Sequence, residues 1–564
     1  MVVGSHIVCP TYFALGVIPG RVGKGFFSVA NGEEFGENSA NIHSRRTPPS
    51  LVAENGPGCT TLREEAVPEY MAYHLLTGAT GLLGSYLLRD GLLAGRQMAV
   101  LARSSRSESA GQRVESLLRR WELAGGRPLP RPVVLQGDLA RDDLNLDGAA
   151  LRWIARNCVS VIHNAASLTF RSEGPDGEPW RSNVEGTRRM LELCRLTGIR
   201  RFHHVSTAYV CGRREGRVLE SELDLGQAMG NVYEQSKLAG ERLVREAPFL
   251  DPPTIYRPSI IVGDSQTGYT STFHGFYALL KLAHTMVSKV VRGATAGRSL
   301  VAAFGLKGTE RKNFVPVDWV SAVMTHIHSR PQLHGGTYHL TSPAPVPLAL
   351  MSEVIQEAVE TYSQLADPNS QWNCDGTWFE QTFRAQMALY QAYWRDDPEF
   401  DVAHTRRAAP HLTCPELDRG RMLRLAKFAI ESNFGRAREP KHQPEFDVQE
   451  HLAGLLAAEQ GLVEGERNFA HLGLKVNGPG GGQWELVVRR DRVVAAEHGV
   501  SSRATAVYHL HSKTFHQLVR RQLTVRQAVR RGEVRIEGNG MEPQRLEAVL
   551  QTAATPSLLD PVMR

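Results

Sequence analysis

A tyrosine and a lysine one helical turn apart, Tyr233 and Lys237, are the residues whose types and spacing point most directly to chemistry. Side chains four positions apart lie on one face of a helix. A phenol with its usual pKa of about 10 exchanges protons poorly at neutral pH. A neighbouring ammonium stabilises the phenolate and lowers that pKa. The pair therefore predicts a tyrosine that exchanges a proton with a substrate oxygen.

A partner hydroxyl is expected on the strand before this helix. Residues 205–210 read Val-Ser-Thr-Ala-Tyr-Val and offer the hydroxyls of Ser206 and Thr207. A second donor beside a carbonyl oxygen would help to stabilise the negative charge that develops there during reduction. The residues themselves leave open which of the two hydroxyls acts.

Three glycines, Gly78, Gly81 and Gly84, lie between a predicted strand, YHLLTG, and a predicted helix. The first two let the backbone turn tightly and approach a pyrophosphate, and the third lets the helix pack against the strand. The N-terminus of that helix attracts negative charge. This context predicts a dinucleotide site, which includes Thr77 and Leu82 of the same loop. The alternative is a structural turn without a ligand.

Arg103 ends the next predicted strand, 19 residues after Gly84, and Arg106 follows it closely. An acidic residue here would bind the ribose 2′-hydroxyl of NAD(H), whereas a guanidinium pairs with the 2′-phosphate of NADP(H). We therefore expect NADP(H), although surface arginines are common. Further cofactor contacts are expected where the third and fourth strands end, from Asp138, Leu139, Asn164, Ala165 and Ala166.

Composition limits the classes of protein. The chain has 564 residues, of which 42% are hydrophobic and 22% charged, and this length corresponds to about three or four globular domains. No stretch approaches the ~18–20 apolar residues of a membrane-spanning helix, and the first residues lack the pattern of a secretory signal. We expect a cytoplasmic protein, with peripheral membrane contact left open.

Cysteine and charge patterns argue against two further classes. The 7 cysteines include no CxxC pair, so neither a disulfide framework nor a metal site is expected. The net charge of +6 is too diffuse over this length to indicate a nucleic-acid partner. The sequence gives no indication of the oligomeric state.

Four regions differ in pattern. Residues 1–70 are rich in Gly, Ser, Asn and Pro, which predicts a disordered extension, with a lid or targeting tail as the alternative. Residues 71–345 alternate β-rich runs with helical segments, which predicts an α/β fold with a doubly wound parallel sheet. Residues 346–445 predict a helical subdomain whose aromatics form a core or a cofactor-stacking surface. Residues 446–564 predict a small α+β domain.

The motifs of residues 72–345 together resemble the extended short-chain dehydrogenase/reductase family. They are TGATGLLG, GDL, HNAA, NVEGT, VSTAYVCG, YEQSK and RPSIIVGDSQTG. The last, with NFVPVDWV, is most similar to the thioester reductase and fatty acyl-CoA reductase branch. The resemblance implies a Rossmann-type fold. The family's SxxxxG pattern, counted back from Gly212, implies Thr207 rather than Ser206 as the active hydroxyl.

This resemblance implies roles for the site residues. Thr207 and Tyr233 would bind the substrate carbonyl oxygen, Lys237 would hold the nicotinamide ribose, and Pro258 and Ser259 would border the nicotinamide. The expected activity is NADP(H)-dependent reduction of an acyl thioester, carried by coenzyme A or by an acyl carrier protein, or of another lipid-like carbonyl.

Residues 446–564 resemble the sterol-carrier-protein fold through GGGQWELVVRRDRVVAAEHG, TFHQLVRRQLT and VRRGEVRIEGN. The resemblance implies a lipid-binding domain, with a scaffolding or dimerisation role left open. A cluster of arginines there offers either a patch for anionic lipid or coenzyme A phosphate, or a solvated helix face. Its members are Arg520, Arg521, Arg526, Arg530, Arg531 and Arg535.

Two other functions remain open. One is a sterol or nucleotide-sugar dehydrogenase or epimerase that uses the same residues. The other is a non-catalytic lipid carrier with a remnant Rossmann domain. The sterol-carrier-like domain and the GDSQTG segment favour a hydrophobic substrate over a sugar, and the intact Thr207, Tyr233 and Lys237 argue against a carrier alone.

Overall fold

The computed structural model describes residues 72–105, 108–170, 174, 176–289, 307–363, 395–435, 447–457, 469–489, 492–538 and 543–551. The predicted extension at 1–70 and the aromatic-rich segment 364–394 lie outside the described residues. In the part that is described, no helix combines the length and the apolar character needed to cross a membrane.

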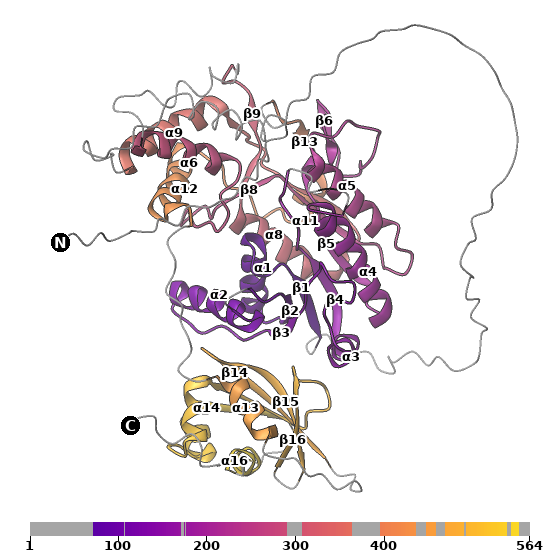
Figure 1. Ribbon diagram of the computed structural model, residues 1–564, viewed down its shortest axis with the longest axis vertical. Helices are drawn as coiled ribbons and strands as arrows, with labels where there is room; N and C mark the ends of the chain where they lie inside the picture. Colours follow the sequence, from indigo (N-terminus) through magenta and orange to yellow (C-terminus); the bar gives the residue numbers. More distant parts are fainter. Residues whose placement is uncertain are drawn as a thin grey trace, which may run out of the picture. The chain divides into compact units, whose positions relative to one another are not determined.

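A seven-stranded parallel sheet forms the first core (Figure 1). The strand order is β11-β7-β5-β4-β1-β2-β3. In chain order the strands are β1 (Tyr73–Thr77), β2 (Gln97–Ala102), β3 (Val133–Gln136), β4 (Cys158–His163), β5 (Arg201–Val205), β7 (Thr254–Pro258) and β11 (Thr337–Leu340). The order reverses between β1 and β4, the point at which doubly wound sheets bind their ligands.

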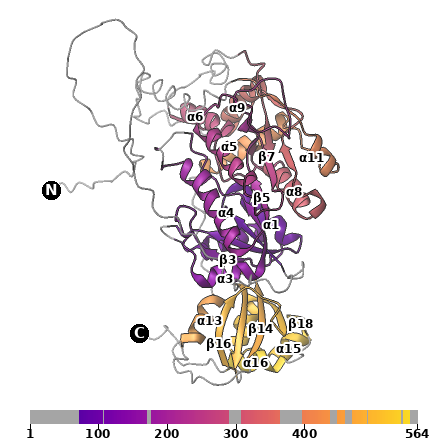
Figure 2. The ribbon, with the colours of Figure 1, turned by 90° about the vertical axis from the view of Figure 1, so that its right-hand side faces the viewer.

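Helices cover both faces of this sheet, which confirms the predicted doubly wound, Rossmann-type fold. The helices are α1 (Leu82–Leu93), α2 (Ala110–Gly125), α3 (Gly148–Asn157), α4 (Gly186–Thr197), α5 (Val232–Arg245) and α8 (Val317–His328). Leu76 of β1 packs with α1, α2 and α8, whereas its neighbour Leu75 packs with α3, α4 and α5. Successive strand side chains point to opposite faces. Figure 2 shows α4 and α5 on one side of the sheet and α8 on the other.

A second core is mainly helical. It contains α6 (Phe276–Lys289), α9 (Leu348–Tyr362) and α12 (Arg419–Glu431), together with side chains of β8 (Ile260–Val262) and β10 (Phe314–Pro316). Three pairs of short strands lie outside the large sheet. β8 pairs with β10, β9 (Arg311–Lys312) pairs with β12 (Val346–Pro347), and β6 (Arg217–Val218) pairs with β13 (Glu399–Phe400). The short helix α11 (Ala403–Ala408) follows β13.

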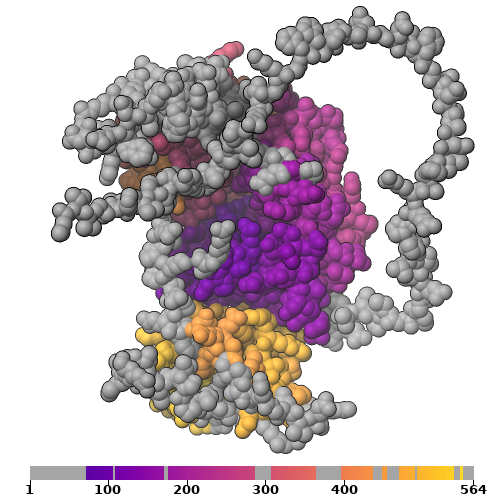
Figure 3. Space-filling view, in the orientation of Figure 1, coloured from indigo at the N-terminus to yellow at the C-terminus, as the bar shows by residue number. Residues whose placement is uncertain are grey.

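The C-terminal region is an α+β domain with its own core, orange to yellow in Figure 3. Its five-stranded sheet has the order β16-β15-β14-β17-β18. The strands are β14 (Ala470–Asn477), β15 (Gly482–Arg489), β16 (Arg492–His498), β17 (Ala506–His511) and β18 (Val534–Gly538). The helices are α13 (Val448–Ala457), α14 (Ser512–Val519), α15 (Val525–Arg530) and α16 (Pro543–Gln551). The β15–β16 hairpin lies where WELVVRRDRVVAAEHG predicts two strands.

Histidines are packed together inside the Rossmann core. His74, His203, His328 and His334 form a cluster in which neighbouring ring centroids are 4.5–4.7 Å apart. Burial lowers the pKa of His74 to about 3, with Arg96 and Arg201 adding to the shift. Burial likewise lowers the pKa of His203 and His328 well below the usual value. These rings are therefore neutral in the folded protein at pH 7.

The free energy of unfolding should fall as the pH is lowered from ~6.5 towards ~4. A histidine whose folded pKa lies below its unfolded value of ~6.5 takes up a proton on unfolding in that range, which costs about 1.4 kcal/mol of stability per pH unit for each such residue. Urea unfolding at several pH values, with net proton uptake measured alongside, checks this. Stability that stays constant between pH ~7 and ~5 would contradict it.

Candidate active site

The glycine loop between β1 and α1 brings backbone segments into close contact. Gly78 has a φ of +71°, and a Cβ on it would lie 2.8 Å from backbone atoms of Ala165. A Cβ on Gly84 would lie 2.0 Å from the carbonyl oxygen of Gly78. Both positions therefore exclude a side chain unless the backbone shifts. This is the construction that lets a pyrophosphate approach the start of a helix.

Thr77 ties this loop to the end of β4. Its hydroxyl oxygen accepts hydrogen bonds from the backbone N–H groups of Asn164 and Ala165, each at 3.1 Å. The Asn164 side-chain amide donates to the carbonyl oxygen of Gly78 at 3.3 Å. The residues predicted at the ends of β1 and β4 are thus joined at the switch point of the sheet.

A crevice of about 890 Å³ contains most of the predicted site residues. Those that line it are Gly78, Gly81, Leu82, Arg103, Asp138, Leu139, Asn164, Ala165, Ala166, Thr207, Tyr233, Lys237, Pro258 and Ser259. Thr77 and Gly84 are not part of the lining, and they act on the shape of the glycine loop instead. Arg106 lies outside the described residues.

Arg113 is a crevice residue that sequence reasoning missed. It lies in the second turn of α2 and donates to the carbonyl oxygen of Arg103 at 2.6 Å and to the hydroxyl of Thr80 at 3.0 Å. Both arginines line the crevice beside the glycine loop. The signal that could have located Arg113 is the capping box of Ser109 and Gln112, because it places the start of the helix and hence the face that this arginine occupies.

The hydroxyl that meets Tyr233 belongs to Thr207. Thr207 caps the short helix η3 (Ala208–Cys211), where its oxygen accepts from the backbone N–H of Tyr209 at 3.3 Å. It forms a side-chain hydrogen bond with Tyr233 and contacts the carbonyl oxygen of Pro258 at 3.3 Å. Lys237 donates to the carbonyl oxygen of Val205, the last residue of β5, at 2.6 Å. Thr207, Tyr233 and Lys237 therefore converge in the crevice.

Burial sets the protonation of this group. It raises the pKa of Tyr233 above its usual range, and the hydrogen bond with Thr207 opposes that shift. It lowers the pKa of Lys237 to about 8, with Glu241 opposing. Near neutral pH the phenol keeps its proton and the lysine keeps most of its charge. The expectation that Lys237 lowers the pKa of Tyr233 is therefore not met, because burial dominates and keeps the phenol protonated.

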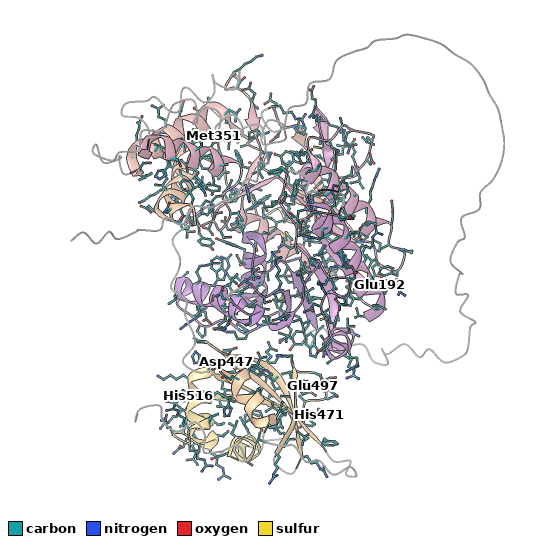
Figure 4. The ribbon with its side chains drawn as sticks, viewed as in Figure 1. Glu192, Met351, Asp447, His471, Glu497 and His516 are labelled. Carbon is teal, nitrogen blue, oxygen red and sulfur yellow. The ribbon has the colours of Figure 1, made fainter. Side chains whose placement is uncertain are left out.

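One wall of the crevice is apolar and comes largely from the second core. Phe276 and Leu279 of α6, Phe314 of β10 and Met351 of α9 all line it, and Figure 4 labels Met351 on its helix. Sequence reasoning missed this wall because apolar residues at helical spacing also describe an ordinary core. The site therefore combines hydrogen-bonding groups on the Rossmann side with apolar surface on the other.

Two family models match separate segments of the chain. Residues 76–324 match the family described as Male sterility protein, and residues 466–551 match the SCP-2 sterol transfer family. The chain thus contains a Male sterility domain and an SCP-2 domain. These two assignments confirm the resemblance of residues 72–345 to thioester reductases and that of residues 446–564 to sterol carrier proteins.

Relatives of the Male sterility domain are parts of larger proteins. Over 286 residues the chain is 27% identical to the nonribosomal peptide synthetase asaC of Aspergillus flavus, covering 48% of this chain and 26% of that protein. Over 411 residues it is 25% identical to the isonitrile lipopeptide synthase of Streptomyces coeruleorubidus, covering 68% of this chain and 26% of that protein. The chain thus spans about a quarter of the length of these relatives.

A solved structure shares the fold. It is the terminal R domain from the myxalamid PKS-NRPS biosynthetic pathway, with a TM-score of 0.51 and 25% sequence identity. The match covers 65% of this chain and 93% of that domain. The likeness therefore extends over nearly the whole of the solved domain.

Proposed function

We propose that the Male sterility domain is an NADP(H)-dependent reductase of acyl thioesters, carried by coenzyme A or by an acyl carrier protein. The observation that carries this proposal is the convergence of Thr207, Tyr233 and Lys237 in the crevice that also holds the glycine loop. NADPH, when bound, would supply a hydride to the carbonyl carbon. The backbone cradle at Gly78 and the arginines at 103 and 113 fit its pyrophosphate and its 2′-phosphate.

The side chains account for the rest of the chemistry. The hydroxyls of Thr207 and Tyr233 would donate to the thioester carbonyl oxygen and stabilise the negative charge that develops on it. Tyr233 would then pass its proton to that oxygen, and the Lys237 ammonium would stabilise the resulting phenolate. Collapse of the hemithioacetal would release the thiol and an aldehyde.

The apolar wall supports a lipid-like substrate over a nucleotide sugar. An alkyl chain that packs against Phe276, Leu279 and Met351 would be removed from contact with water. This is favourable, because burial of apolar area contributes roughly 25 cal/mol per Å². A sugar carries several hydroxyls, and they would find few hydrogen-bond partners on this wall. The SCP-2 domain is consistent with a hydrophobic substrate, and the R-domain likeness with one linked to a carrier.

Stoichiometry tests the proposed reaction. With an acyl-coenzyme A substrate, we expect one thiol released for each NADPH oxidised to the aldehyde stage, measured by thiol titration and absorbance at once. NADPH oxidation by a sterol ketone without thiol release would favour the alternative dehydrogenase. If NADPH does not bind at all, only the lipid-carrier function would remain.

Replacement of Arg103 with aspartate should raise KM for NADPH by about 10- to 100-fold and leave KM for NADH nearly unchanged. The substitution would remove one or two charge-assisted hydrogen bonds to the 2′-phosphate, which only NADPH carries. Arg127→Asp is the matched control, because Arg127 is exposed and does not line the crevice. Equal changes for both cofactors would refute the assignment of the phosphate.

A further inference from the structure

The carboxylate of Asp397 joins Tyr209 and Lys312, two residues that line the crevice. Its Oδ2 atom accepts hydrogen bonds from the Tyr209 hydroxyl at 2.8 Å and from the backbone N–H of Asn313 at 2.7 Å. Its Oδ1 atom accepts from the ammonium of Lys312 at 2.6 Å. The side chains of Asp397 and Lys312 are each only 5% exposed. Three donors, one of them a cation, therefore converge on a single buried carboxylate.

The Tyr209 side of this network leads to the active hydroxyl. Tyr209 lies in η3, lines the crevice and is 5% exposed. Its backbone N–H donates to the hydroxyl oxygen of Thr207. Because Tyr209 is held at its hydroxyl by Asp397 and at its backbone by Thr207, the position of the ring and the position of the threonine hydroxyl depend on each other.

The Asn313 side leads to Ser259, which follows β7 and also lines the crevice. The Asn313 side-chain oxygen accepts a hydrogen bond from the hydroxyl of Ser259 at 2.8 Å. Ser259 follows Pro258, whose carbonyl oxygen contacts the Thr207 hydroxyl. The carboxylate of Asp397 is thus joined to Thr207 along two routes, one through Tyr209 and one through Asn313 and the strand end at Pro258.

A strap, defined here as residues 395–401, holds Asp397 in this place. Arg395 donates to the carbonyl oxygen of Gly212 at 2.8 Å, just beyond the end of η3. Phe400 packs with Ala208 and Cys211 of the same short helix. The strap also pairs with β6 through β13, and Figure 1 shows these two strands side by side. The strap therefore supports η3 at several points, and the Asp397 carboxylate bonds two residues that line the crevice, Tyr209 and Lys312.

We propose that Asp397 is a positioning residue of the reductase site, which holds the Thr207 hydroxyl against the substrate oxygen through Tyr209 and Asn313. The inference rests on the proposed function and adds a residue that does not line the crevice. A carboxylate suits this role because it only accepts hydrogen bonds and balances the buried charge of Lys312.

Tyr209→Phe is the sharpest variant, since it removes one hydroxyl and keeps the ring. We expect kcat to fall by roughly 10- to 100-fold, the scale of a small misplacement of a reacting group, with the Kd for NADPH unchanged. Asp397→Asn should lower kcat at least as much and also reduce the melting temperature. Tyr338→Phe is the matched control, because Tyr338 is a buried tyrosine of β11 outside the crevice lining, and its hydroxyl donates to the carbonyl oxygen of Leu333 at 2.6 Å.

A double-mutant cycle separates positioning from general support. In a Thr207→Ala background, Tyr209→Phe and Asp397→Asn should cause little further loss of kcat, because the hydroxyl that they position is already absent. If the kcat losses of Thr207→Ala and of the second substitution multiply, the proposal is overturned. It is also overturned if Tyr209→Phe is as active as Tyr338→Phe.

The variants are assayed in the full chain on an acyl-coenzyme A and on the matching long-chain aldehyde. Wild-type activity on the aldehyde alone would refute thioester reduction, while the cycle measured on the aldehyde would still decide the role of Asp397. Wild-type activity on neither substrate would overturn both proposals.

Discussion

Tyr233→Phe should lower kcat for thioester reduction by about 10²- to 10⁴-fold, the usual contribution of a positioned general acid. The substitution removes the phenol proton and one of the two donors to the carbonyl oxygen. Because Phe keeps the ring, its edge contact with Phe170 at 5.7 Å between centroids is retained. The Kd for NADPH should therefore stay close to that of the wild type. Steady-state kinetics and a fluorescence titration with NADPH measure the two quantities.

The control for this prediction is Tyr338→Phe, which also deletes a phenolic hydroxyl but outside the crevice. It should leave kcat unchanged. A Tyr233→Phe enzyme that retains most of its kcat would show that another group donates the proton. A large loss of NADPH affinity would show that Tyr233 mainly shapes the cofactor site.

Gly84→Ala should weaken NADPH binding by about 5- to 150-fold. The added Cβ would lie 2.0 Å from the carbonyl oxygen of Gly78 and 2.7 Å from its carbonyl carbon. Both are backbone atoms, so no flexible side chain can move aside, and the loop itself must shift. Overpacking of this kind costs roughly 1–3 kcal/mol, and the strain falls on the segment that would hold the pyrophosphate. Calorimetric titration with NADPH measures the effect.

Gly125→Ala is the matched control, because a Cβ at Gly125, the last residue of α2, meets no atom within 4 Å. It should leave NADPH affinity and melting temperature essentially unchanged. If Gly84→Ala binds NADPH as tightly as Gly125→Ala, the loop does not need its present conformation, and the cofactor site lies elsewhere.

Local patterns explain why the fold class and the glycine loop were predictable. Gly78, Gly81 and Gly84 lie within seven residues, from the turn after β1 into the first turn of α1, and their spacing indicates a tight turn with close backbone packing. The same is true of Tyr233 and Lys237, since four residues on a helix bring two side chains to one face. The structure confirms the sheet and its helices, while the chemical roles of these residues stay predictions.

Long-range contacts explain what sequence reasoning missed. Tyr209 and Asp397 are 188 positions apart, and no periodicity near either residue indicates the other. Met351 and Leu279 have the spacing of ordinary helix cores, so only the packing of α6 and α9 shows that they face the crevice. The place of Arg113 in the crevice depends on where α2 begins, and the sequence alone did not fix that residue. In each case the missing information is the tertiary packing of segments that are distant in the sequence.

Transfer of deuterium from NADPH labelled at both C4 positions tests the central claim most directly. When the full chain converts an acyl-coenzyme A, we predict deuterium on the former carbonyl carbon of the product, one thiol released per molecule, and loss of both signals in Tyr233→Phe. Mass spectrometry of the product and thiol titration give the two readings. Thiol release without deuterium on that carbon would mean hydrolysis rather than reduction, and would contradict the proposed reductase.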